Sequence, residues 1–169
     1  GTGGTDGYAG SRLQGAEYLT LNSTAAATSS STYEYDFMDG ARSYNWTNSS
    51  WYAWMFKRAT GFFDVVAYTG TGVAGLTQTH NLGKTPELLS AKKRSASSYA
   101  GWAVYYGVAQ NLYLNRSDRA GYWGSNAVTS VSNDTFVLGA NSDVNESPET
   151  YIASLFATLA GVSKVGSYT

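Results

Sequence analysis

A stretch of nineteen residues in the middle of the chain recurs in diverged form 100 positions later. Residues 51–69 read WYAWMFKRATGFFDVVAYT, and residues 151–169 read YIASLFATLAGVSKVGSYT, without a gap between them. The residues that recur unchanged are Ala53, Phe56, Gly61, Val65, Tyr68 and Thr69, which return as Ala153, Phe156, Gly161, Val165, Tyr168 and Thr169. An internal repeat constrains the fold before any other feature, because each repeat is one structural unit.

The repeat extends upstream, with an offset that drifts from 93 to 100 residues through loop insertions. Residues 19–22 (LTLN) match residues 112–115 (LYLN), and the further matches are Phe37 with Phe136, Gly40 with Gly139, and Asn45 with Asn145. We therefore expect a first, incomplete unit at residues 1–60 with a glycine-rich N-terminal arm. A complete unit follows at 61–160, and residues 161–169 start a further unit or form a terminal strand, all within one compact domain. The first unit has no counterpart to residues 80–94.

The residue types favour strands and tight turns, because aromatic residues make up 15% of the chain, with 19 glycines and 2 prolines. Short strands are expected at residues 17–21, 33–38, 52–56, 62–68, 87–94, 102–106, 112–115, 135–138, 151–156 and 162–168. Helix competes only at 52–56, where aromatic residues and the early Gly61 favour a strand. No segment predicts a convincing helix. The sequence thus predicts an all-β fold, an antiparallel β-sandwich or jelly-roll-like architecture built from a repeat of about 100 residues.

The two ends of the chain share a repeated turn. Residues 68–72 read YTGTG, and placing Tyr168 and Thr169 before Gly1, Thr2 and Gly3 regenerates the same string. We expect this chain, which starts with glycine rather than methionine, to be a segment of a tandem array, or a subunit whose terminal strands pair head-to-tail with neighbours. The residues expected in this assembly are Gly1, Thr2, Gly3, Val165, Tyr168 and Thr169.

Charge and cysteine content exclude several classes of function. With 11 basic and 12 acidic residues, the chain has no charge excess to favour a nucleic acid or an anionic membrane. Since cysteine is absent, no disulfide, zinc-thiolate site or thiol nucleophile is possible. No apolar run reaches the length of a membrane span. We expect no cofactor, no metal and no membrane insertion.

No group of residues makes a convincing catalytic centre. The single histidine, His80, is expected to bond local backbone in a turn rather than act as a base. The acidic clusters are expected to be solvated, and they are Glu34, Asp36 and Asp39, and Asp143, Glu146 and Glu149. Alternate oxygen ligands at Asn141, Asp143 and Asn145 begin like a calcium loop, but the rest of that motif is missing. Residues 92–94 (KKR) are expected to be a solvated strand end.

Tryptophans and tyrosines among Ser, Asn and Gly are the candidate ligand-binding residues. Rigid aromatic rings beside short polar side chains are typical of sugar or protein recognition. The alternative is that these rings cap the core or lie at subunit contacts. The candidates, for a glycan or a protein ligand, are Trp46, Trp51, Trp102, Trp123, Tyr44, Tyr99 and Tyr122.

Taken together, these residues resemble a repeat found in tail-fibre and other virion proteins of tailed bacteriophages, especially marine ones. The segments that carry the resemblance are 54–72, 80–87 with 92–95, 18–24, 150–153 and 161–169. The resemblance implies a non-enzymatic structural role in the virion or at its surface, with copies of the chain or other virion proteins as partners. Alternatives are a tail-fibre domain that binds a host-surface glycan or receptor and, more weakly, a polysaccharide depolymerase.

Overall fold

The computed structural model describes residues 6–31, 33–35, 40, 42–43, 52–95, 100–107, 112–117 and 127–166. The described chain is mostly β-sheet, and every strand pair in it is antiparallel. The expected all-β class is confirmed.

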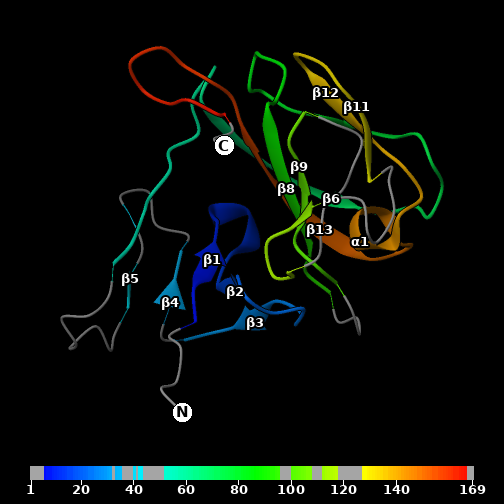
Figure 1. The fold of residues 1–169 in the computed structure, drawn as a ribbon. Helices are drawn as coiled ribbons and strands as arrows, with labels where there is room; N and C mark the ends of the chain where they lie inside the picture. The colour runs from blue at the N-terminus through cyan, green and yellow to red at the C-terminus, as the bar shows by residue number, and fades with distance from the viewer. Residues whose placement is uncertain are drawn as a thin grey trace.

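A five-stranded sheet forms the centre of the molecule (Figure 1). Its strands, in spatial order, are β10 (Leu112–Tyr113), β9 (Ala103–Tyr105), β8 (Leu88–Lys93), β13 (Thr150–Phe156) and β6 (Phe63–Thr69). β13 pairs with β6 over seven positions, from Thr150 opposite Thr69 to Phe156 opposite Phe63. β13 also pairs with β8, so both of its edges are occupied.

Smaller sheets surround this centre. One contains β11 (Val128–Val131), β12 (Thr135–Leu138) and β7 (Leu76–Thr79), and another contains β1 (Tyr8–Gly10), β2 (Glu17–Thr20) and β3 (Thr28–Ser29). A two-stranded pair consists of β4 (Tyr33–Glu34) and β5 (Arg42–Ser43). Two short helices complete the described elements, η1 (Arg12–Gln14) and α1 (Ser142–Asn145).

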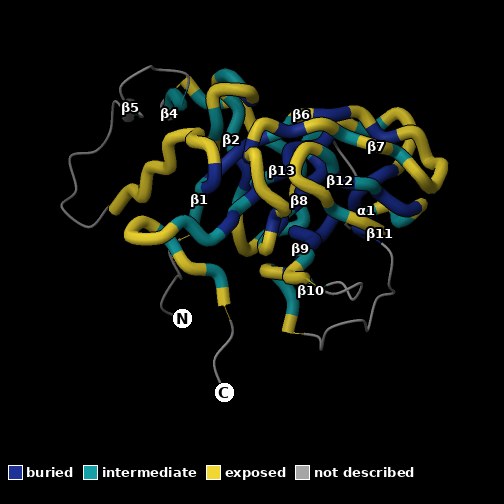
Figure 2. The backbone as a smooth tube through the Cα atoms, turned by 90° about the horizontal axis from the view of Figure 1, so that it is seen from above, coloured by how far each residue is buried: buried dark blue, intermediate teal, exposed yellow. Residues whose placement is uncertain are grey.

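Alternation along the central strands gives the sheet two apolar faces, because successive side chains point to opposite sides. On one face, Ala91, Ala153 and Leu155 pack in a cluster with Phe136 and Leu138 of β12. On the other face, the cluster consists of Phe63, Val65, Trp102 and Ile152 with Leu19 of β2. The central sheet is therefore buried on both sides, and Figure 2 shows β1 and β2 on one side of it and β11, β12 and α1 on the other.

Several expected strands coincide with observed ones, because strong alternation fixes them locally. The expected segments 17–21, 62–68, 87–94, 135–138 and 151–156 match β2, β6, β8, β12 and β13 to within a residue or two. The strands β1, β3, β7 and β11 are not in the prediction, because glycine, threonine and serine dominate these segments and side-chain patterning does not reveal them.

Two expected strands are wrong in the described part of the chain. Residues 52–58 are exposed and belong to no strand, and residues 164–166 also lie outside any strand. A strand needs a partner, and no strand of the described chain pairs with either segment, although β6 and β10 are edge strands of the central sheet. The apolar pattern at 52–56 is therefore not sufficient to make a strand.

Candidate functional site

The same tight turn occurs twice, 100 residues apart. In the first copy, Ala59 N donates to Phe63 O at 2.9 Å, and Phe62 N and Phe63 N donate back to Ala59 O at 3.1 Å each. In the second copy, Leu159 N donates to Ser163 O at 3.1 Å, and Val162 N and Ser163 N donate to Leu159 O at 2.9 Å each. The repeated sequence therefore forms the same hydrogen-bonded turn in both places.

A glycine in the left-handed region makes this turn possible. Gly61 has a φ of 77° and Gly161 a φ of 76°, values that side chains with a Cβ rarely adopt. The two turns lie next to each other, since a Cβ on Gly61 would come within 3.4 Å of Leu159 Cδ1. In addition, Ala157 N donates to Phe62 O at 3.1 Å. Both turns thus sit at one end of the central sheet.

An exposed apolar segment precedes the first turn. The exposed fractions are 87% for Tyr52, 87% for Trp54, 68% for Met55 and 53% for Phe56. Large apolar side chains that lie side by side on a surface mark an interaction site more often than isolated ones do. We call residues 52–58 the aromatic segment.

Phe56 connects this segment to the central sheet. Its ring centroid lies 5.6 Å from that of Phe63 and 5.6 Å from that of Phe156, which are themselves 4.7 Å apart. Phe62 also lies within 6.3 Å of Phe56. The aromatic segment therefore starts from the end of β6 and β13 and extends into solvent.

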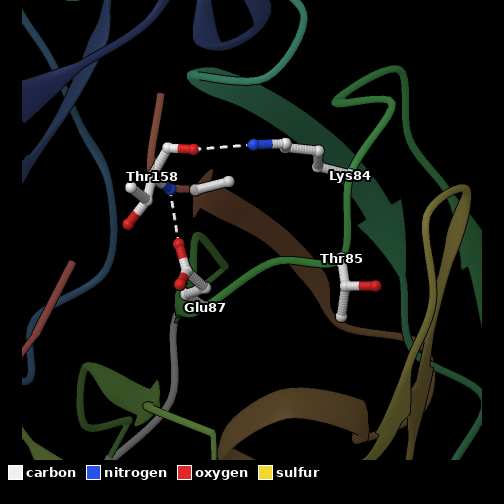
Figure 3. A pocket seen from close by; sticks show the side chains of 5 residues that line it. Lys84, Thr85, Glu87 and Thr158 are labelled. Atoms are coloured by element: carbon white, nitrogen blue, oxygen red, sulfur yellow. Dashed lines mark hydrogen bonds between the residues drawn. The ribbon is translucent and has the colours of Figure 1, made fainter. Parts of the chain in front are cut away.

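A shallow pocket of about 350 Å³ lies beside the second turn (Figure 3). Its lining residues are Lys84, Thr85, Glu87, Ala157 and Thr158. Lys84 Nζ donates to Thr158 O at 2.9 Å, and the Glu87 carboxylate accepts from Thr158 N. Hydrogen bonding from Thr158 lowers the pKa of Glu87 below its usual value. The charged groups hold the chain that leads into the second turn, and they do not converge on the hollow.

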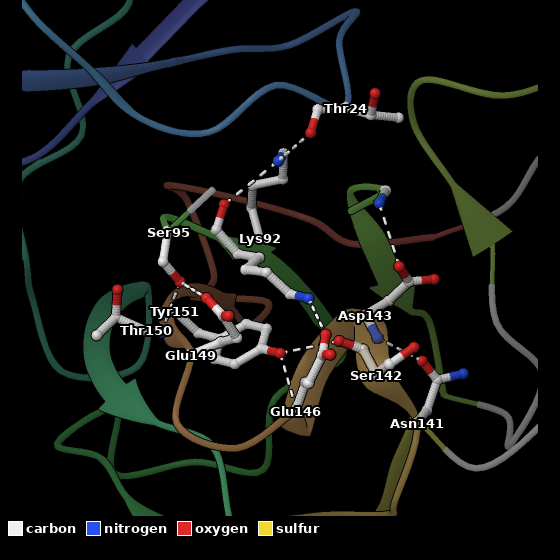
Figure 4. A network of polar contacts seen from close by, with 12 residues as sticks. Thr24, Lys92, Ser95, Asn141, Ser142, Asp143, Glu146, Glu149, Thr150 and Tyr151 are labelled. Atoms are coloured by element: carbon white, nitrogen blue, oxygen red, sulfur yellow. Dashed lines mark hydrogen bonds and ion pairs between the residues drawn. The ribbon is translucent and has the colours of Figure 1, made fainter. Parts of the chain in front are cut away.

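A polar network fixes α1 to the C-terminal end of β8 (Figure 4). Lys93 forms an ion pair with Glu146, and the Glu149 carboxylate accepts from Ser95 Oγ. The hydroxyl of Tyr151 donates to Ser142 O and accepts from Glu146 N, both at 2.8 Å. The acids at 146 and 149, expected to be solvated, thus bind partners in the chain.

Lys92 points to the opposite face of β8 and holds the N-terminal layer. Its Nζ donates to Ala25 O at 2.9 Å and to Thr24 O and Lys93 O at 3.3 Å each. Burial lowers the pKa of Lys92 to about 8. Arg94 pairs with Glu17 at 2.8 Å. The expected solvated strand end at 92–94 is wrong, because Lys92 and Lys93 are 0% and 2% exposed.

Asn145 is a buried connector that the sequence prediction did not identify as such. Its Nδ2 donates to Val73 O at 2.8 Å and to Gly139 O at 2.7 Å, and its Oδ1 accepts from Thr71 N at 2.8 Å. The match between Asn45 and Asn145 in the repeat was the available signal. Because both polar atoms of the Asn145 side chain make hydrogen bonds within the chain, this residue of the calcium-loop pattern has a structural role.

The other two residues of that pattern are also engaged. Asn141 Oδ1 accepts from Asp143 N at 2.8 Å and so caps α1. Asp143 accepts from Tyr113 Oη at 2.6 Å and from Gly101 N at 3.3 Å. Within the described ranges, no group of three or more His, Asp or Glu residues gathers in a way that could hold a metal ion.

Asp64, at the start of β6, is another buried polar group that the sequence prediction did not identify, and here no sequence signal was available. Burial raises the pKa of this carboxyl, but hydrogen bonds from Arg58, Asn81 N and Val65 N outweigh burial, and the pKa lies below its usual value. The side chain thereby holds the first turn against the loop after β7.

His80 is a buried turn histidine, as predicted. Its Nδ1 accepts from Leu82 N at 3.2 Å, and its ring stacks on Phe136 with centroids 6.4 Å apart. No acid of the described chain makes a hydrogen bond with it. The ring stabilises the connection between β7 and β8.

Only Trp102, among the predicted aromatic ligand residues, belongs to the described chain. It is buried, and its Nε1 donates to Thr20 O at 2.9 Å, so it packs the core between two layers. This outcome matches the alternative kept open for these rings. The other six candidates lie outside the described residues, and they are Trp46, Trp51, Trp123, Tyr44, Tyr99 and Tyr122.

Of the predicted assembly residues, Val165 is described. It is partly buried, and its N donates to Thr158 Oγ1 at 3.0 Å. Gly1, Thr2, Gly3, Tyr168 and Thr169 lie outside the described residues. The short helices of the described chain lack the length and apolar character that crossing a bilayer requires.

Comparison with known proteins gives one match. The chain matches no curated protein and no solved structure. A family defined as a domain of unknown function, DUF7483, matches residues 39–169, which is most of the chain and includes both repeated turns and the whole central β6–β13 pair. The chain therefore belongs to the DUF7483 family.

Proposed function

We propose that this chain is a non-enzymatic structural domain of a bacteriophage virion, in a fibre, appendage or surface protein, that associates with copies of itself or packs on neighbouring virion proteins. The observation that carries the proposal is the aromatic segment, where Tyr52, Trp54 and Met55 are each at least 68% exposed. Burial of each such side chain contributes roughly 1.5–3 kcal/mol, so a partner that covers this segment gains substantial free energy.

The internal chemistry of the domain supports a structural role. The buried Lys92, Lys93 and Asp64 bind other parts of the chain, and the groups that line the pocket hold the main chain of Thr158. Polar groups that serve a reaction need free orbitals or protons facing a ligand. The virion assignment itself comes from the resemblance of the sequence to phage tail-fibre repeats.

The architecture we propose is a β-sandwich built from a repeated unit. The face-to-face packing of the central sheet with β11, β12 and β7 supports the sandwich. The recurring turn at 59–63 and 159–163 supports a repeat of about 100 residues. On this interpretation, residues 1–60 are an incomplete first unit, 61–160 a complete unit, and 161–169 the start of another.

Self-association is testable by sedimentation equilibrium of the purified chain over a wide concentration range. Replacing Trp54 and Met55 together by serine removes apolar surface from the aromatic segment, and the dissociation constant of the oligomer should rise at least about tenfold. The control is Val73→Ser, because Val73 is as exposed as Met55, at 68%, and lies elsewhere.

Two results would contradict self-association through the aromatic segment. A chain that stays monomeric at every concentration does not assemble with itself. Equal weakening by the Val73 control would show that the aromatic segment has no particular role.

Binding of a host-surface glycan or receptor is the second candidate. It is favoured by the flat rings of Tyr52 and Trp54, which are both 87% exposed and available for stacking on a sugar. A glycan array distinguishes the two functions. Specific binding that is lost in Tyr52→Ala or Trp54→Ala, with the chain remaining monomeric, would favour recognition over assembly.

A further inference from the structure

The pairing of β13 with β6 is a template for a second pairing. β13 leads directly into the second turn, and β6 follows directly from the first turn. By the 100-residue offset, residues 52–56 before the first turn correspond to 152–156 in β13. Residues 163–166 after the second turn correspond to 63–66 in β6. The chain thus contains the paired strands β13 and β6, a second copy of the β13 sequence at 52–56, and a second copy of the β6 sequence at 163–166.

The two further halves do not pair with each other within the chain. Residues 52–58 and 163–166 both belong to the described part, and no main-chain hydrogen bond joins them there. Both are accessible to solvent, since residues 52–58 are all exposed, as are Lys164 and Gly166, and Ser163 and Val165 are half-buried. Main-chain N–H and C=O groups without a strand partner are open to pairing with a strand of another chain. The two segments correspond to the two strands of the β13–β6 pair, so each could supply the partner that the other lacks.

We propose that residues 52–56 of one copy pair antiparallel with residues 163–166 of a second copy, in the register that β13 and β6 adopt within the chain. This inference rests on the proposed function, since it assumes that copies of the chain associate. In β13 and β6, Ala153 lies opposite Val66, Ser154 opposite Val65, Leu155 opposite Asp64 and Phe156 opposite Phe63. The intermolecular pairs are then Ala53 with Gly166, Trp54 with Val165, Met55 with Lys164, and Phe56 with Ser163.

Side-chain chemistry suits this register. In a paired strand, Tyr52, Trp54 and Phe56 would lie on one face, which corresponds to the face of Ile152 and Phe156 in β13. Val165 joins them on that face, opposite Trp54. Opposite Ala53, Gly166 has no side chain, and the space around its Cα is open in the single chain, so no neighbouring group of its own chain blocks a partner strand.

The new strand pair would continue an existing aromatic cluster. Phe56 already contacts Phe63 and Phe156 through its ring. A partner strand placed beside Phe56 therefore begins at the end of the central sheet. Its apolar face extends the cluster that buries Val65 and Ile152. Reciprocal exchange gives a two-fold dimer, and one-way exchange gives a ring or a linear chain of copies.

Disulfide trapping tests the register directly, because the chain has no cysteine of its own. Chains carrying Ala53→Cys are mixed with chains carrying Gly166→Cys in a glutathione redox buffer. The disulfide-linked product is identified on non-reducing gels and by mass spectrometry of the linked peptides. Both positions are exposed, so the variants should fold, and circular dichroism checks that they do.

The matched control pairs Ala53→Cys with Lys164→Cys, which is also exposed but is displaced by two residues along the strand. Directly opposed positions bring Cβ atoms within disulfide range, and diagonal ones lie about 7–8 Å apart, so the in-register pair should cross-link about tenfold more than the control. Sedimentation of the unmodified chain runs in parallel.

The outcomes separate the register from the function. Association in sedimentation with equal cross-linking of both pairs, or with none, overturns the register but not the assembly function. A monomer in sedimentation overturns the register and the self-association part of the proposed function together. A doubly substituted Ala53→Cys, Gly166→Cys chain that closes a disulfide within one molecule overturns the choice of a second copy.

Discussion

At the scale of single residues, the most unexpected feature is the burial of two lysines, Lys92 and Lys93, in the central sheet. Lys92 is fully buried, and its ammonium is bonded only to backbone carbonyls at Thr24, Ala25 and Lys93. An ammonium in this position loses hydration, and for this reason its pKa falls from 10.5 to about 8.

This shift predicts a specific dependence of stability on pH. The folded pKa is the lower one, so between pH 8 and 10.5 the unfolded chain binds more protons, and stability due to Lys92 rises with pH. Relative to Lys92→Met, the wild-type protein should gain about 2 kcal/mol in unfolding free energy between pH 7 and pH 9.5.

Urea denaturation of the two proteins at both pH values measures this gain. The range stops below the ordinary pKa of tyrosine, because the buried Tyr68, Tyr113 and Tyr151 have raised pKa values and would add a trend of opposite sign. Parallel pH profiles in the two proteins would show that Lys92 does not titrate in this window.

The sequence predicts residues of this kind poorly. His80 could be predicted, because a lone histidine before an Asn-Leu-Gly turn has local backbone to bind, and it does accept from Leu82 N. The burial of Lys92 and Lys93 could not, since it depends on a layer more than sixty residues earlier in the chain and on α1 more than forty residues later. Local pattern carries no information about either contact.

At the scale of elements, the loop after β6 is held against α1 by close backbone contact. A Cβ on Gly70 would lie 2.3 Å from Glu146 O and 2.9 Å from Asn145 C. In the same loop, Gly70 N donates to Glu149 O and Gly72 N to Asn145 O, both at 2.8 Å. The repeated string at 68–72 therefore places a glycine where the main chains of two elements touch.

Gly70→Ala should consequently destabilise the fold by more than about 2 kcal/mol, because the opposing atoms are backbone and cannot rotate away. The matched control is Gly166→Ala, where a Cβ meets open space. Chemical denaturation compares the two variants. Equal stabilities would mean that the β6–α1 contact is loose enough to absorb a methyl group.

Element prediction succeeds here where the sequence alternates strongly, as in β12, whose bounds match the prediction, and in β13. It fails at residues 52–56, where the pattern is as strong as in β13 but no strand of the described chain pairs with the segment. Strand formation is a property of two segments, and the sequence of one segment specifies only half of it.

At the scale of the whole molecule, the central sheet is shared by two cores, one on each face. Leu19 is fully buried in the core on the N-terminal side, against Phe63, Val65 and Ile152. Lys92, Arg94 and Trp102 add polar contacts across the same boundary. We therefore expect the N-terminal layer and the central sheet to unfold together.

Leu19→Ala should lower the unfolding free energy by about 3 kcal/mol. It should also reduce hydrogen-exchange protection of amides in β13, not only in β2. Leu21→Ala, at a side chain that is 38% exposed, should cost much less. Unchanged protection in β13 in the Leu19 variant would indicate two independent folding units.

The all-β class could be predicted from the abundance of aromatic residues, glycines and short alternating segments, and it is confirmed. The burial of the central sheet on both faces could not, because β8 carries two lysines at positions that a polarity pattern assigns to solvent. Lys92 donates to main-chain carbonyls of the N-terminal layer, and Lys93 pairs with Glu146. These contacts exist only in the folded chain.

The position of the two repeated turns, side by side where Phe63 faces Phe156, has a mechanical consequence. Tension applied through the segments before residue 59 and after residue 163 enters and leaves the domain at the same end of the sheet. Such a load separates the residue pairs of β6 and β13 one after another, starting at Phe63 and Phe156, instead of shearing all seven pairs at once. A fibre joined through these segments would extend under modest force, with each domain acting as an extensible link and Phe56 reinforcing the first rung.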